Sequence, residues 1–143
     1  MSSGRVARWW ALPVSERWIA TSAQAALPAI DLMLWLVGYI RLRRALDFLS
    51  PLAKPRAADA DDLHRADRLA QLVSVVGQEG LVGVSCLRQA LLVYLLLRRR
   101  GLAPDIRFGV RQGSLAVEAH AWVEVDGHEI GAGSMQHLPM ASR

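Results

Sequence analysis

The stretch SCLRQALLVYLLLRRRG, residues 85–101, predicts a helix that begins at Cys86 and closes at Gly101. Ser85 is suited to cap the first turn, and the three arginines before the glycine offset the negative end of the helix dipole. The free amides and positive dipole at a helix start favour the thiolate form of a cysteine placed there. Cys86 is therefore a candidate nucleophile, although a free cysteine is often only a small buried residue.

The segments on either side of this helix predict the fold class. Leu63 to Val76 has helical apolar spacing and is followed by Gly77, so a second helix is expected upstream. After Pro104 the apolar period becomes alternating, which predicts three strands joined by two-residue turns. The strands are Asp105–Arg111, Leu115–Val125 and His128–Ile130, with turns at Gln112-Gly113 and Asp126-Gly127. Helices packed on a small antiparallel sheet make an α+β domain.

The N-terminal part is helical and apolar in pattern, and we expect it to be an extension, residues 1–56, on a core formed by residues 57–143. The run Trp18–Ile40 is long enough to span a bilayer, which takes about 20 apolar residues. Pro28 is expected to divide this run into two helices, and Asp31 would be costly in lipid. We therefore expect a buried or interfacial helix pair, with partner docking favoured over membrane contact.

Length and composition indicate one domain in a reducing compartment. The 143 residues fit a single domain, and the one cysteine cannot form an internal disulfide. No secretory pattern opens the chain, so the cytoplasm is the expected location.

The net charge of +4 comes mostly from arginines in the runs 41–44 and 98–100, both expected at helix C-termini. These runs lack the interleaved aromatic residues of a single-strand platform, so nucleic acid is not an expected partner. The other histidines, His64, His128 and His137, are scattered along the chain. Because a zinc site needs three or four converging ligands, we expect no metal site, and no cofactor is indicated.

The second candidate for chemistry is His120, in the run AHAWVEVDG, residues 119–127. Small alanines flank this imidazole, on a strand well separated from the cysteine helix. An imidazole that takes the proton of a thiol creates the ion pair with which papain-like enzymes attack an amide carbonyl. The alternative is an ordinary strand histidine.

Four stretches together resemble the protease half of the lasso peptide B protein. They are residues 85–91, 95–102, 105–111 and 119–127, and the resemblance covers roughly residues 60 to 130. It implies a transglutaminase-like (papain-like) cysteine protease core that removes the leader from a lasso peptide precursor.

The resemblance also implies partners and a catalytic triad. The family uses a separate small leader-recognition protein, and the macrocyclase is a further possible partner. Its Cys–His–acid triad would take Cys86 and His120 as nucleophile and base. The family's acid lies on the strand after the histidine strand, where this chain has GAGS at residues 131–134 and no carboxylate.

Strand arithmetic ranks substitutes for the missing acid. A two-residue turn at Gln112-Gly113 would set Asp105 opposite His120, which makes Asp105 the preferred third member. Asp126 and Glu129 would lie too far along the sheet from His120 to orient its imidazole. Gln136, a water molecule, or a dyad without a third member remain open.

Trp122 lies two residues past His120 and hence on the same strand face. It is a candidate substrate-binding residue that walls the peptide groove, with a core aromatic as the alternative. The expected function is a cytoplasmic, cofactor-free leader peptidase. The alternatives are a non-catalytic scaffold of the same fold in a peptide-maturation complex, and a membrane-associated binding protein that uses Trp18–Ile40.

Overall fold

The computed structural model describes residues 11, 13–51, 54–79, 86–112, 117–131 and 138–139. The helices are α2 (Val14–Val37), α3 (Tyr39–Leu49), α4 (Ala60–Glu79) and α5 (Cys86–Arg99). The strands are β1 (Pro104–Gln112), β2 (Val117–Val125), β3 (His128–Ile130) and β4 (Leu138–Pro139).

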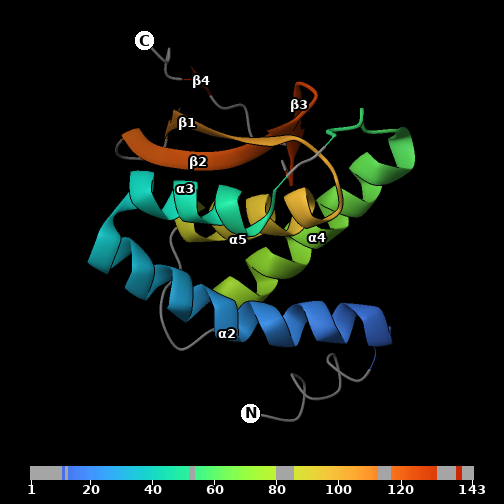
Figure 1. Ribbon diagram of the computed structural model, residues 1–143, viewed down its shortest axis with the longest axis horizontal. Helices are drawn as coiled ribbons and strands as arrows, with labels where there is room; N and C mark the ends of the chain where they lie inside the picture. Colours follow the sequence, from blue (N-terminus) through green and yellow to red (C-terminus); the bar gives the residue numbers. More distant parts are fainter. Residues whose placement is uncertain are drawn as a thin grey trace.

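The four strands form one antiparallel sheet in the order β3-β2-β1-β4. Helix α5 packs against the two central strands, and α4 contacts both α5 and β3. Helix α2 lies across the helices on the side away from the sheet, so the helices drawn in Figure 1 all lie on one face of it. The predicted α+β class is confirmed, and β4 is an element that the sequence did not predict.

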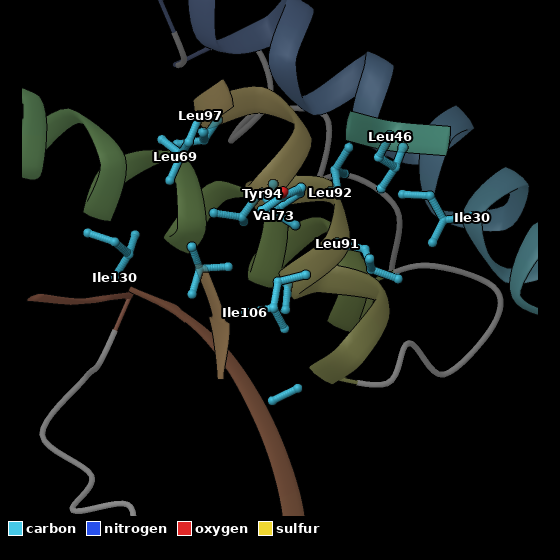
Figure 2. Packing of buried hydrophobic residues seen from close by; sticks show 14 of the residues in the cluster. Ile30, Leu46, Leu69, Val73, Leu91, Leu92, Tyr94, Leu97, Ile106 and Ile130 are labelled. Carbon is cyan, nitrogen blue, oxygen red and sulfur yellow. The ribbon is translucent and has the colours of Figure 1, made fainter. Parts of the chain in front are cut away.

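The hydrophobic core is centred on α5. Five consecutive residues of this helix, Ala90–Tyr94, are buried, and Leu97 is buried one turn later. A helix that is apolar on nearly every side belongs in the interior. Figure 2 shows its side chains meeting Val73 of α4 and Ile106 of β1, so helices and sheet share one core.

The predicted break at Pro28 is wrong, because α2 runs without interruption from Val14 to Val37. An interior proline costs about 3 kcal/mol. Leu27 and Ile30 are buried on the same helix, and each contributes about 1.5–3 kcal/mol by burial, which offsets that cost. The chain turns instead at Gly38, whose φ of 78° lies in the left-handed region that favours glycine.

Helices α2 and α3 are attached to the rest of the chain by apolar and ionic contacts. Leu27, Ile30, Leu42 and Leu46 belong to the same buried cluster as α5, so the N-terminal helices and the sheet region share one core. Asp31, in the second half of α2, pairs with Arg88 of α5 at 2.7 Å.

The arginine run 41–44 lies in the first half of α3 and not at a helix C-terminus, so that prediction is wrong. Arg43 bonds to the Tyr39 hydroxyl at 3.2 Å and lies over the ring of Tyr94. The run 98–100 does lie at the end of α5, as predicted.

The second hairpin has the predicted register. Val125 pairs with His128, and the turn residues Asp126 and Gly127 have φ angles of 50° and 80°. Positive φ at both central positions is the mark of a type I′ turn, which matches the twist of the flanking strands.

The end of β3 lies against α4. The Gly131 amide donates to Asp67 Oδ1 at 2.8 Å, and a Cβ added at Gly131 would lie 2.7 Å from the Ala70 Cβ. With a φ of 77°, this position requires glycine both for its conformation and for the close approach.

Several large apolar side chains remain exposed on α2 and α3. Trp35 is 81% exposed and Phe48 is 85% exposed, and Leu36 and Ile40 are also exposed near the turn between the helices. Among the described helices, α2 alone is long and apolar enough to cross a membrane, a test that a core helix also passes. Its inner face packs on the core through Ala23 and Leu27.

Candidate active site

The Cys86 thiol lies against β2, where it contacts the backbone of the two residues that flank His120. The backbone amide of Ala121 donates to Cys86 Sγ at 3.4 Å, and the sulfur lies 4.0 Å from the carbonyl oxygen of Ala119. Adding the two covalent bonds between the Ala121 nitrogen and the His120 Cα puts the sulfur within about 6 Å of that Cα. The structure therefore places the Cys86 sulfur beside the backbone of His120, the other residue that the sequence singled out for chemistry.

The sulfur occupies the edge of β2 that faces β3. Backbone groups of alternate residues point to the same side of a strand, so Ala119 and Ala121 continue the series of Val123 and Val125 that points toward β3. Among the described residues, β3 pairs with β2 only from Val123 to Val125. The thiol thus contacts polar groups of β2 next to the paired segment.

The start of α5 supplies further polar groups at this place. Cys86 is the first residue of α5 and is partly buried. The first amides of a helix have no partner within it, and they carry the positive end of the dipole. The Cys86 sulfur thus lies between the start of α5 and the Ala121 amide.

His120 is held by an aromatic neighbour. Its ring stacks on Trp122 with the centroids 6.0 Å apart and the planes 18° from parallel. Trp122 is only 6% exposed, and its indole Nε1 donates to Glu124 Oε1 at 3.2 Å. The other oxygen of Glu124 accepts from Arg107 Nε at 3.0 Å.

These contacts form a row on one face of the sheet. His120, Trp122 and Glu124 alternate along β2 and point away from α5, whereas Ala121 and Val123 face the core. No role was predicted for Glu124 from the sequence. Its position two residues after Trp122, and hence on the same strand face, is the signal that could have indicated its contact with the indole. The groove-wall role suggested for Trp122 stays a prediction.

The predicted position of Asp105 is wrong. Asp105 pairs with Glu124, and the residue opposite His120 is Gly109. Strand β1 continues to Gln112, which pairs with Val117, so the first hairpin does not turn at Gln112-Gly113.

This shift of four residues keeps Asp105 on the face of His120 but moves it about 13 Å along the strand. Its carboxylate lies 3.1 Å from Arg43 Nη2 and 3.5 Å from Arg107 Nε. Asp105 is therefore an ion-pair residue in this structure and does not orient the imidazole.

The other acids near the hairpins lie where the sequence placed them. Glu129 pairs with Glu124, four residues from His120, and Asp126 Oδ2 accepts from the Ala58 amide at 2.7 Å. Both are too far along the sheet to orient His120, as predicted. Ser85, Gln136 and residues 132–134 lie outside the described residues. Within the described ranges, no three His, Cys, Asp or Glu side chains gather to hold a metal ion.

Comparison with protein-family models gives a match over most of the chain. The model of the transglutaminase-like superfamily matches residues 26–140, from the middle of α2 to beyond β4. The chain belongs to the transglutaminase-like superfamily. No curated protein and no solved structure matches the chain.

Membership in the transglutaminase-like superfamily agrees with the architecture and with the site. The superfamily is generally built on a cysteine protease fold, and its members are often cysteine peptidases or transferases. A cysteine at the start of the central helix, against a strand that carries a histidine, suits that chemistry. The match also includes α3 and the second half of α2.

Proposed function

We propose that the chain is a cysteine peptidase that removes the leader from a ribosomally made lasso peptide precursor. Cys86 is the nucleophile and His120 is the general base. The observation that carries this proposal is the hydrogen bond from the Ala121 amide to Cys86 Sγ, because it holds the thiol against the strand segment that carries His120.

The reaction follows from these two groups. His120 takes the thiol proton, and the thiolate attacks the carbonyl carbon of the scissile amide, forming the carbon–sulfur bond. Backbone amides at the start of α5 stabilise the resulting oxyanion. The imidazolium gives its proton to the leaving amine as the carbon–nitrogen bond breaks. Water, deprotonated by His120, then hydrolyses the thioester and releases the free carboxyl end.

The choice of substrate rests on the resemblance to the lasso leader peptidases. The stretches that carry it include the start of the Cys86 helix and the strand with His120 and Trp122. A small leader-recognition protein would present the leader, and a macrocyclase would use the released core peptide. We place the reaction in the cytoplasm, where ribosomal precursors are made.

The exposed apolar residues of α2 and α3 are the proposed docking surface for the recognition protein. Trp35 and Phe48 are the most exposed of them. Large exposed apolar patches on soluble proteins mark interaction sites. Docking there would lower the apparent KM for the precursor.

Cleavage of a lasso precursor tests the proposal. A lasso precursor and a leader-recognition protein would be incubated with wild type, Cys86→Ala, His120→Ala and Asp105→Asn chains, and the products measured by mass spectrometry. We expect wild type and Asp105→Asn to release the leader, and the other two to release none.

Release by a folded Cys86→Ala chain would contradict the proposal. A folded wild-type chain that binds the precursor and its partners without cutting would instead support the scaffold alternative.

A further inference from the structure

A second candidate site lies at the far end of α5 from the thiol. A cavity of about 700 Å³ opens between the first turns of α2, the first and middle turns of α4 and the end of α5. This volume lies within the range of ligand-binding sites. Cys86 begins α5 and Arg100 follows its last residue, so the length of the helix puts the cavity roughly 20 Å from the thiol.

Two acidic residues of the cavity are already paired with arginines. Both oxygens of Glu16 accept from Arg68, each at 3.1 Å. Asp62 accepts two hydrogen bonds from Arg56, one of them at 2.8 Å. The bond from Arg56 is the main reason that the pKa of Asp62 is lowered to about 2, so this carboxylate stays charged. These four residues leave no net charge for a ligand.

Among the described residues, the two further arginines of the cavity form no ion pair with a residue that lines it. Arg65 pairs with Asp61 at 2.6 Å, but Asp61 does not line the cavity and both side chains are more than 60% exposed. Such a pair is weak and yields readily to a competing carboxylate. No described residue forms an ion pair or hydrogen bond with the guanidinium of Arg100. The cavity therefore has an excess of positive charge at Arg65 and Arg100.

The same cavity has an apolar side. Ile19 of α2, Leu72 of α4 and Leu102 after α5 line it together with the arginines. A ligand that fits both features combines a carboxylate with an apolar group. Arginine prefers carboxylates because its planar fork donates two parallel hydrogen bonds.

We propose that this cavity is an exosite that binds an acidic and apolar segment of the precursor peptide. The proposal rests on the proposed peptidase function, since that function supplies a peptide substrate. An extended chain covers at most about 3.6 Å per residue, so the bound segment lies at least about six residues from the cut bond. The exosite would hold the precursor while the thiol and imidazole act on its other part.

Binding of a defined peptide tests the exosite apart from cleavage. The probe is a fluorescein-labelled 12-residue peptide of four Glu, four Leu and four Ser, and its control has Gln in place of Glu. Anisotropy is measured with the full chain carrying Cys86→Ala, so that nothing is cut. We expect the Glu peptide to bind at least about fivefold more tightly than the Gln peptide, the scale of a partly exposed charge contact.

Matched charge reversals locate the binding. Arg100→Glu should weaken binding of the Glu peptide by about fivefold or more, and added salt should reduce the difference. Arg99→Glu changes the same charge on the adjacent residue, which does not line the cavity, and should have little effect. Thermal unfolding of both variants checks that the fold is kept.

Equal binding of the two peptides would overturn the exosite, and so would equal weakening by the two reversals. The proposed function is judged separately, from cleavage of the precursor by wild type. Cleavage whose KM is unchanged in Arg100→Glu would refute the exosite and leave the peptidase standing. Tight binding that Arg100→Glu weakens, in a chain that never cleaves, would support the site and refute the peptidase.

Discussion

Replacing Trp122 tests whether the indole takes over part of the role of a triad acid. The ring stacks on His120, and Glu124 fixes the indole through its Nε1. Trp122→Leu removes both the ring and the donor, whereas Trp122→Phe keeps a ring but removes the donor. If Trp122 is a positioning residue, the leucine variant should lose more activity than the phenylalanine variant.

The structure sets the size of the effect. A stacked aromatic pair contributes about 0.5–1.5 kcal/mol beyond its buried area. If about 1 kcal/mol of this orients the imidazole for proton transfer, its loss lowers kcat about fivefold, since 1.36 kcal/mol is a factor of ten. KM should change little, because Trp122 is only 6% exposed and offers little surface to a peptide.

The assay is steady-state cleavage of the precursor, together with thermal unfolding of each variant. Val73→Ala is the stability control, because Val73 is fully buried in α4 and does not line the cavity. It should lower Tm without lowering the kcat of folded protein. A Trp122→Leu chain that is folded and keeps the wild-type kcat would refute the positioning role, and a change confined to KM would favour the groove-wall role.

Three further outcomes are expected. Asp105→Asn should leave kcat within about twofold of wild type, because Asp105 pairs with Arg43 and lies far from His120. A large loss of kcat in the same cleavage assay would restore Asp105 as the third member of the catalytic triad. Gly131→Ala should destabilise the fold by about 1–2 kcal/mol or more, since its φ is positive and Ala70 crowds the added carbon; an unchanged Tm would contradict this. The chain should leave the membrane fraction on a high-salt or carbonate wash, because α2 is packed on the core through Ala23; retention after both washes would indicate a spanning helix.

The elements that local chemistry specifies were predictable from the sequence. The Asp126-Gly127 turn follows from two residues that tolerate positive φ, and it fixes the register of β2 and β3. The start of α5 at Cys86 and the strand that carries His120 were also found, and with them the pair that forms the candidate site.

The failures arose where tertiary contacts outweighed a local signal. Gln112-Gly113 is a reasonable turn by composition, yet β1 continues through Gln112 and pairs it with Val117. The resulting shift moved Asp105 away from His120. Pro28 was expected to break a helix, but the buried face of α2 offsets the lost hydrogen bond.

The alkylation rate of Cys86 tests the central claim most directly, because the chain has one cysteine and every adduct reports on it. Wild type and His120→Ala would be treated with iodoacetamide from pH 6 to 9 and followed by intact mass. We predict that wild type at pH 7 reacts about tenfold faster than free cysteine, which is only a few per cent thiolate there, and that His120→Ala loses most of this advantage. Equal rates for the two chains, at or below that of free cysteine, would contradict a nucleophile activated by His120.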